Sequence, residues 1–216
     1  TFLLNLMSSP GSGKTTTLAC TIEALAGDLS IGVMGADIDS DVDARAMAAT
    51  GVTAIQLHTG GMCHLDAAMC RQGLAELEAA AEAAGTAPLD LAILENVGNL
   101  VCPAEFDTGA SVNVAILSVP EGDDKPLKYP LMFEVCDVVL VNKMDVAPYF
   151  DFDLARCEEN VRLRNPGAKV IAMSAKTGEG ADAWVAWLRA AVAAWKTGTF
   201  EKATPANSEA PHYPGE

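Results

Sequence analysis

The sequence predicts an α/β domain of three layers, in which helices flank a mostly parallel sheet of roughly seven strands. Short apolar and β-branched runs recur along the chain without the polar alternation of half-exposed strands. Helical patterns separate these runs, as crossovers between parallel strands require. A third observation is the Gly-Ser-Gly-Lys-Thr segment at 11–15, which lies between the first run and the first helical pattern. This order is typical of a P-loop nucleoside triphosphatase.

Strands and helices are expected to alternate along most of the chain. The strands are predicted at 2–8, 31–36, 52–57, 89–95, 112–119, 135–141 and 168–173. The helices are predicted at 13–27, 43–50, 62–85, 151–164 and 180–196. In the last helix, four apolar side chains at spacings of three to four indicate a face packed on the sheet, namely Trp184, Leu188, Val192 and Trp195. After Lys196 the pattern dissolves, so a domain is predicted over 1–197 and a flexible tail over 198–216.

Composition and charge narrow the class of protein. A chain of 216 residues can bury a full core as one domain. Half of its residues are apolar, yet no run approaches the roughly 18 needed to cross a bilayer. The net charge of −15 argues against nucleic acid as a partner, because phosphate binding needs clustered Lys and Arg. The chain opens on a strand-like run without a basic leader, and its six cysteines form no CxxC pair, so a cytoplasmic protein is expected.

The glycine-rich segment has the residues that phosphate binding needs. Its glycines let backbone N–H groups approach phosphate oxygens, and the start of the following helix adds its dipole. Lys14 is expected to reach the β- and γ-phosphates, and the Thr15 hydroxyl to ligate Mg²⁺. Ser8 stands where the usual first glycine of the motif would be. The nucleotide-binding residues predicted here are Gly11, Ser12, Gly13, Lys14, Thr15 and Thr16.

Two later segments indicate guanine as the base. Asn142-Lys143-Met-Asp145 directly follows an apolar run, at the strand end where open α/β sheets bind ligands. The Asp145 carboxylate can accept hydrogen bonds from the N1–H and the exocyclic amine of guanine, which adenine does not offer, with Asn142 as local support. After another strand, the backbone around Ser174, Ala175 and Lys176 is expected to contact the base. Together the segments favour GTP over ATP.

Acidic residues at two strand ends are candidates for the nucleotide switch. Asp37 begins an Asp-rich segment over 37–43, which is either a solvated loop or a source of Mg²⁺ ligands, with Asp37 the first choice and Asp39 the second. Glu95 is expected to hold a Mg²⁺-bound water, and the Gly98 N–H to sense the γ-phosphate. Asn99 follows, so no glutamine orients the attacking water, and slow intrinsic hydrolysis is predicted. The predicted catalytic residues are Lys14, Asp37, Glu95 and Gly98.

A cysteine and a histidine that a GTPase does not need suggest a metal site. Cys63 and His64 are adjacent, and Cys102 lies four residues beyond Gly98. Thiolates and imidazole suit Ni²⁺ or Zn²⁺ far better than Mg²⁺. Adjacent helical residues point about 100° apart, so the pair can chelate only at a frayed first turn or when two copies of the chain face each other. On the residues alone, buried core thiols remain an equal alternative.

The combined motifs resemble the HypB family, the nickel-insertion GTPases of [NiFe]-hydrogenase maturation. The resemblance rests on the segments at 8–15, 63–66, 95–104, 125–130 and 142–145. It implies GTP and GDP binding with Mg²⁺, and a GTP-promoted homodimer with Ni²⁺ (Zn²⁺ being possible) on Cys63, His64 and Cys102. It also implies a HypA-like zinc-containing partner and delivery of nickel to the precursor of the hydrogenase large subunit.

Three other functions stay open at this point. A urease-type nickel accessory GTPase shares the P-loop and the metal chemistry, although the strings at 63–66 and 95–104 favour the hydrogenase branch. A nickel-binding or storage module without a catalytic role would have a vestigial P-loop, which the intact Lys14, Thr15 and Asp145 argue against. A regulatory GTPase with incidental cysteines would be indifferent to loss of Cys63.

Overall fold

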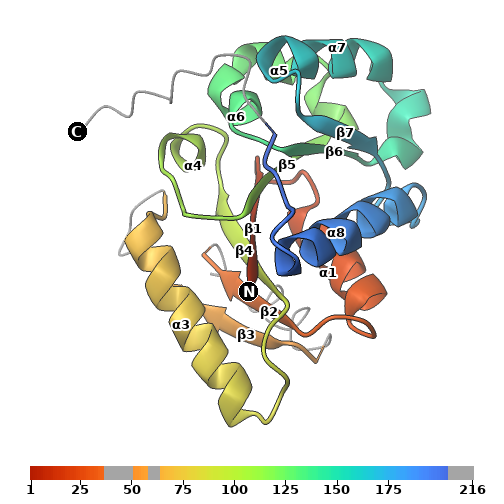
Figure 1. Cartoon of the computed structure of the whole chain (residues 1–216). Coiled ribbons are helices and arrows are strands. Elements are labelled where there is room, and N and C mark those ends of the chain that lie inside the picture. The colour runs from red at the N-terminus through yellow and green to blue at the C-terminus, as the bar shows by residue number, and fades with distance from the viewer. Residues whose placement is uncertain (37–50, 58–63, 204–216) are drawn as a thin grey trace.

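The computed structural model describes residues 1–36, 51–57 and 64–203, and within them the strands form one sheet in which every pairing is parallel. The seven strands are ordered β3-β2-β4-β1-β5-β6-β7 (Figure 1). Their bounds are β1 Phe2–Ser8, β2 Ile31–Gly35, β3 Thr53–Gln56, β4 Leu91–Gly98, β5 Val112–Ser118, β6 Val138–Asn142 and β7 Lys169–Ala172. The predicted fold class and the strand number are confirmed.

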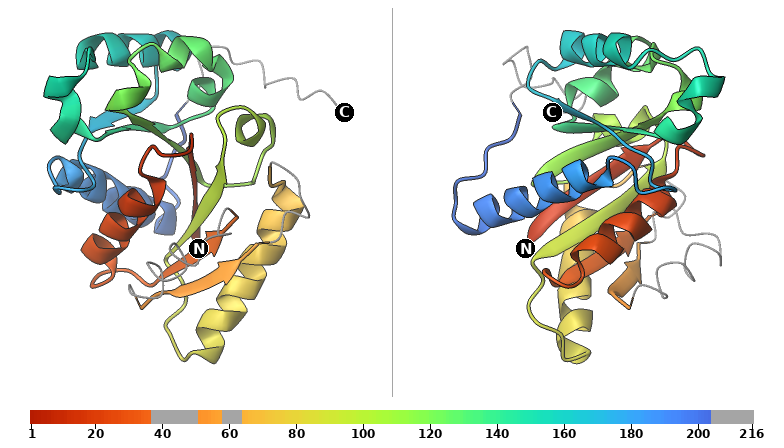
Figure 2. Two further views of the ribbon diagram at one scale, coloured as in Figure 1. Left: turned by 180° about the vertical axis from the view of Figure 1, so that it is seen from behind. Right: turned by 90° about the vertical axis from the view of Figure 1, so that its right-hand side faces the viewer.

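Two long helices cover one face of the sheet (Figures 1 and 2). They are α1, Lys14–Leu25, and α8, Ala181–Lys196, and their apolar sides pack with β1, β4, β5 and β6 into one buried cluster. Trp184 is buried there and its indole Nε1 donates a 2.9 Å hydrogen bond to the Thr21 hydroxyl. The prediction for Trp195 was wrong in part, because 43% of it is exposed while its ring edge meets Phe2. It lies in the last turn of α8, near the rim of the sheet.

The opposite face carries α3, Ala67–Ala83, α6, Pro130–Glu134, and α7, Leu154–Arg164. Two separate apolar clusters lie under these helices, one beneath α3 and one beneath α6 and α7. Asp66 caps α3 by accepting a 2.8 Å hydrogen bond from the Met69 N–H. Since capping residues fix where a helix begins, α3 begins at Ala67 and not at 62 as predicted.

Several short elements were not predicted. They are α4, Cys102–Glu105, α5, Lys125–Lys128, and the 3₁₀ helices η1, Val119–Glu121, and η2, Met144–Tyr149. Strand β4 also continues to Gly98, so the expected switch residues are part of the strand and do not follow it. The helix expected at 43–50 lies outside the described residues. No described helix has the length and apolar character to cross a membrane.

The described end of the chain contacts the domain. Phe200 packs edge-on against Phe2, and the Ala203 N–H donates a 2.8 Å hydrogen bond to the Asp137 carboxylate. The Lys202 ammonium donates to the Ala110 carbonyl at 2.6 Å. The predicted tail therefore includes residues 198–203 with such contacts, whereas 204–216 lie outside the described residues.

Candidate functional site

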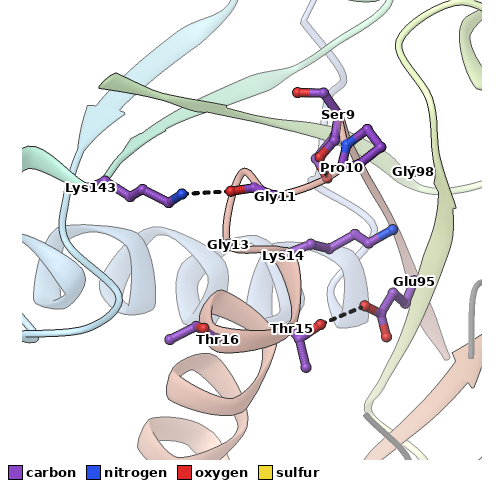
Figure 3. Close-up of a pocket in the computed structure, with 11 residues that line it drawn as sticks. Ser9, Pro10, Gly11, Gly13, Lys14, Thr15, Thr16, Glu95, Gly98 and Lys143 are labelled. Atoms are coloured by element: carbon purple, nitrogen blue, oxygen red, sulfur yellow. Dashed lines mark hydrogen bonds between the residues drawn. The ribbon is translucent and has the colours of Figure 1, made fainter. Parts of the chain in front are cut away.

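The P-loop joins β1 to α1 and forms one wall of an open pocket of about 480 Å³ (Figure 3). Gly13 caps α1 with a left-handed φ of 95°, and a Cβ there would lie 2.5 Å from Asn142 Nδ2. Only glycine fits this combination of backbone angle and close approach. Lys14 is 8% exposed, and its ammonium donates a hydrogen bond to the Asn96 carbonyl. The buried Ser12 hydroxyl has no hydrogen-bond partner among the described residues.

The opposite wall of the pocket is the end of β4. Glu95 is 3% exposed, and its Oε1 accepts a 3.4 Å hydrogen bond from the Thr15 hydroxyl. Figure 3 shows these two side chains pointing toward each other, with Gly98 further along the same strand. Hydroxyl and carboxylate oxygens are the ligands that Mg²⁺ prefers, so Thr15 and Glu95 fit a metal-assisted phosphate site. Asp37, the first predicted Mg²⁺ ligand on the Asp-rich segment, lies outside the described residues.

The segments predicted to recognise the base are bound to the P-loop. Asn142 Nδ2 donates to the Ser12 carbonyl at 3.0 Å, and Asn142 Oδ1 accepts from the Ala175 N–H at 3.0 Å. The Ser174 hydroxyl donates to Asp145 Oδ1 at 2.7 Å. Lys143 has a φ of 63° and its ammonium donates to the Gly11 carbonyl at 2.5 Å (Figure 3). Asn142 thus supports the phosphate loop and the base loop together.

Lys176 follows Ala175 and is exposed. Asp145 is half-buried, and among the described residues only its Oδ1 accepts a hydrogen bond. Its Oδ2 can therefore accept hydrogen bonds from a ligand. The six residues predicted from the sequence for the base lie at the carboxyl ends of two neighbouring strands. Asn142 ends β6, with Lys143 and Asp145 directly after it, and Ser174, Ala175 and Lys176 follow β7.

Two of the three predicted metal ligands lie in the described part of the chain. The His64 ring stacks on Phe106, with ring centroids 3.5 Å apart and an angle of 7° between the planes. Cys102 is the first residue of α4, and its Sγ accepts a 3.4 Å hydrogen bond from Asn99 Nδ2. Cys63 lies outside the described residues. The described residues alone hold no group of three or more His, Cys, Asp or Glu side chains arranged to bind a metal ion.

The other cysteines in the described part of the chain are suited to the core and not to metal binding. Cys70, Cys136 and Cys157 are buried free thiols in the clusters on the α3 and α7 side. Burial raises the pKa of Cys70 and of Cys157 to about 12, and it raises the pKa of Cys136 as well. Cys20 is half-buried in α1, and burial followed by the charge of Glu23 raises its pKa. Thiols that stay protonated are poor metal ligands, which agrees with a core role.

Sequence reasoning missed a buried polar row that crosses the centre of the sheet. Asn96 Nδ2 donates to Asn5 Oδ1 at 2.9 Å, and Asn5 Nδ2 donates to Asn113 Oδ1 at 3.0 Å. The Asn113 N–H in turn donates to Asp137 Oδ2 at 2.8 Å. Since Asn96 also accepts from Lys14, this row begins at the phosphate site. The available signal was an asparagine within each of three largely apolar strands.

The chain has clear relatives. Residues 2–172 match the model of the CobW/HypB/UreG nucleotide-binding domain. The hydrogenase maturation factor HypB of Azotobacter chroococcum is 51% identical over 189 residues, which cover 87% of this chain and 59% of that protein. The chain therefore spans about three fifths of that relative's length. The hydrogenase/urease maturation factor HypB of Helicobacter pylori is 43% identical, with 81% of this chain and 70% of that protein covered.

Solved structures give the same result. HypB from Archaeoglobus fulgidus is similar with a TM-score of 0.80 and 37% identity, covering 89% of this chain and 90% of that chain. HypB from Helicobacter pylori in complex with nickel has a TM-score of 0.81 and 36% identity, covering 93% and 89%.

Proposed function

Because this chain belongs to the CobW/HypB/UreG family, and within it to HypB, we propose that it is a GTP-hydrolysing metallochaperone which binds nickel and promotes its insertion into the large subunit of a [NiFe]-hydrogenase. One observation carries the proposal. Strand β4 holds Glu95 at 3.4 Å from the Thr15 hydroxyl and ends at Gly98, four residues before Cys102. The phosphate site and a predicted metal ligand thus lie on one continuous segment.

In this proposal the P-loop holds the phosphates of GTP. The backbone N–H groups from Gly11 to Thr16 and the Lys14 ammonium bind phosphate oxygens, and Thr15 and Asp37 hold Mg²⁺. The bound Mg²⁺ would supply charge neutralisation at the β- and γ-phosphates. Glu95 orients a water, and the Gly98 N–H senses the γ-phosphate. Intrinsic hydrolysis is slow, since Asn99 occupies the position after this glycine.

Guanine is recognised by the two loops after β6 and β7. The Asp145 carboxylate accepts the N1–H and amine hydrogen bonds of the base, while Asn142 holds the loops together through Ser12 and Ala175. The backbone of Ala175 and Lys176 lines the base. This carboxylate favours guanine over adenine because adenine has no N1–H and no 2-amino group to donate to it.

Nickel is bound by Cys63, His64 and Cys102 where two copies of the chain meet. GTP favours this dimer, and hydrolysis loosens it and releases the ion in the cytoplasm. A HypA-like zinc-containing partner then takes part in delivery to the hydrogenase precursor. By reciprocity, bound nickel must change the affinity for the nucleotide by the same factor.

A urease-type target is the second candidate. It is favoured by the name of the Helicobacter pylori relative, which covers both hydrogenase and urease maturation. The nucleotide and nickel chemistry would be the same, and only the receiving enzyme would differ. Nickel transfer to a hydrogenase precursor and to an apo-urease, measured side by side, distinguishes the two.

The first test is a nickel titration of the full chain in Mg²⁺, with either GDP or a non-hydrolysable GTP analogue, while the oligomer mass is followed. We expect the analogue to promote a dimer with a changed nickel affinity, and Cys102→Ala to lose nickel binding. Cys20→Ala is the matched control, because this thiol is also half-buried but lies in α1. A nickel affinity that is the same with either nucleotide and is unchanged in Cys102→Ala would refute the proposal.

A further inference from the structure

We propose that Asn99 and Phe106 are positioning residues that attach Cys102 and His64 to the end of β4, so that one segment sets the position of both metal ligands. This inference rests on the nickel-binding function proposed above. This segment begins at Gly98, the predicted sensor of the γ-phosphate, and ends at Phe106, immediately after α4.

Asn99 holds the sulfur of Cys102 through a carboxamide whose orientation is fixed. Its Oδ1 accepts a 2.7 Å hydrogen bond from the Val101 N–H, and this contact requires an acceptor. The NH₂ group must therefore be the end that faces Cys102 Sγ, at 3.4 Å. The backbone N–H of Asn99 donates to the Val97 carbonyl at 2.8 Å, so the residue is also tied to β4. This donor, together with the contact to β4, fixes the position of the Cys102 sulfur relative to the end of the strand.

Phe106 holds the imidazole of His64. The rings lie 3.5 Å apart and 7° from parallel, which is a stacked contact. The lone pair with which a neutral imidazole binds a metal lies in the plane of the ring, so a phenyl ring stacked on the face does not cover it. The stacked contact therefore fixes the plane in which His64 can bind a metal ion, and the Phe106 ring does not block the place of that ion. Restricting the ring before binding also lowers the entropy cost of coordination.

The two contacts are joined by a single helical turn. Cys102 begins α4 and Phe106 follows its last residue, four positions later. Phe106 itself has an extended backbone, so one short turn of helix is all that separates the two residues along the chain. Figures 1 and 2 show the start of α3, which His64 precedes, beside α4 in both views. His64, from a distant part of the sequence, is thereby held next to the turn that carries Cys102.

The Phe106 side chain contributes little to the buried core. Phe106 is 39% exposed and belongs to none of the three buried apolar clusters. Removing its ring should therefore leave the fold intact. Removing the ring should also free His64 from the end of β4. A movement of Gly98 would then still shift Cys102 but would no longer shift His64.

The test compares Phe106→Ala and Asn99→Ala with the unchanged chain in nickel titrations containing Mg²⁺ and either GDP or a non-hydrolysable GTP analogue. We expect each variant to bind nickel about 10-fold more weakly, as loss of a residue that orients a ligand usually does. The ratio of the nickel affinity with the GTP analogue to that with GDP should approach one in Phe106→Ala. The nickel–thiolate charge-transfer absorption should weaken in Asn99→Ala. Phe106→Tyr, which keeps the stacked ring, should restore both the affinity and the ratio.

A direct readout of the stack needs no metal. In the unchanged chain the ring protons of His64 should show an upfield NMR shift from the ring current of Phe106, and Phe106→Ala should remove it. Leu163→Ala is the control for loss of an exposed apolar side chain, because Leu163 is 68% exposed on α7. This control should bind nickel like the unchanged chain.

The outcomes separate this inference from the function on which it rests. If Cys102→Ala and His64→Ala lose nickel binding while Phe106→Ala and Asn99→Ala keep the full affinity and its nucleotide dependence, the positioning role is overturned and the metallochaperone function stands. If Cys102→Ala and His64→Ala bind nickel unchanged, both are overturned. A nickel affinity of Phe106→Tyr as low as that of Phe106→Ala also contradicts the role of stacking.

Discussion

Asn142 accepts a 3.0 Å hydrogen bond from the backbone N–H of Ala175, and this contact ties the end of β6 to the loop after β7. The same side chain donates to the Ser12 carbonyl at 3.0 Å. One buried carboxamide therefore holds together the two loops predicted to bind guanine and the loop predicted to bind phosphate. A buried amide that uses both of its ends has no interchangeable substitute.

Asn142→Ala should destabilise the fold. It leaves the Ala175 N–H and the Ser12 carbonyl without their partner, and each such buried group costs about 1–3 kcal/mol. We expect the free energy of unfolding measured in urea to fall by about 2–6 kcal/mol. Gln72→Ala removes an exposed 2.9 Å hydrogen bond to Glu76 and serves as the control. Equal losses in the two variants would contradict the role given to Asn142.

Gly13→Ala should weaken nucleotide binding strongly. The new Cβ would lie 2.5 Å from Asn142 Nδ2, at a φ of 95° that side chains rarely adopt. We expect a loss of GTP affinity on the order of 10²-fold, because the P-loop or Asn142 must move. Gly27→Ala is the matched control, since a Cβ at Gly27 meets nothing within 4 Å and its φ is not positive. Titration calorimetry with GDP and GTP measures both variants.

Asp145→Asn should change the base that is preferred. The variant has an NH₂ donor where the carboxylate would accept from the guanine amine, so the GTP affinity should fall on the order of 10²-fold. Xanthosine triphosphate has a carbonyl oxygen in place of that amine and should bind Asp145→Asn better than it binds the unchanged chain. Asp182→Asn, at the exposed start of α8, controls for the loss of one negative charge. An unaltered ratio of GTP to xanthosine triphosphate affinity would contradict Asp145 as the base-reading residue.

Acid should remove the stabilising effect of Asp123. Burial opposes its charge, but hydrogen bonds from the Arg156 guanidinium at 2.7 Å and the Asp153 N–H at 2.9 Å outweigh burial and lower the pKa of Asp123. A carboxylate whose pKa is lower in the folded chain stabilises the fold above its ordinary pKa near 4, and the effect disappears as the pH falls through the folded value.

The difference in urea midpoint between the unchanged chain and Asp123→Asn should therefore be largest at neutral pH and shrink from pH 5 to pH 2. Glu179→Gln, at an exposed position, should show a small difference throughout. A difference for Asp123→Asn that grows on acidification would mean that the pKa of Asp123 is raised and not lowered.

Cysteine labelling should distinguish Cys102, the thiol predicted to bind metal, from the buried core thiols. With a pKa of about 12, Cys70 and Cys157 are thiolate at pH 8 in only about one molecule in ten thousand, and both are also buried. Half-buried Cys102 should react with iodoacetamide at least about 10²-fold faster, as followed by peptide mass spectrometry. Nickel should protect Cys102, and urea should make all thiols react alike. Labelling of Cys70 as fast as that of Cys102 would contradict this assignment.

The sequence predicted the strands well because both faces of this sheet are covered, so each strand is a nearly continuous apolar run. It could not predict the order of the strands, which depends on how the helices pack. The fourth strand was predicted to end at Glu95, whereas β4 continues to Gly98. In the structure Asn96 is fully buried within β4, where Asn5 of the neighbouring strand satisfies its amide.

The sequence predicted the motifs of the candidate site separately but not the side-chain contacts that connect them. The sequence predicted that Asp145 reads the base with Asn142 as local support, yet it gave no sign that Asn142 bonds to Ser12. Nor did it indicate that Asn99, noted only for not being a glutamine, contacts Cys102. The one-turn helix α4 was missed because four residues are too few to show a helical period. Side-chain pairs between distant segments become visible only when the chain is folded.

The contact between Asn142 and Ser12 joins residues 130 positions apart, and the contact between Asn142 and Ala175 joins residues 33 positions apart. A chain growing from its N-terminus makes the phosphate loop early, but it cannot complete the guanine loops until Ala175 has been added and β7 has docked. Domains usually fold as units during synthesis. GTP should thus stabilise only the finished domain, by an amount that rises with the logarithm of its concentration. The nucleotide that we propose as the driver of the switch would also select complete chains over truncated ones.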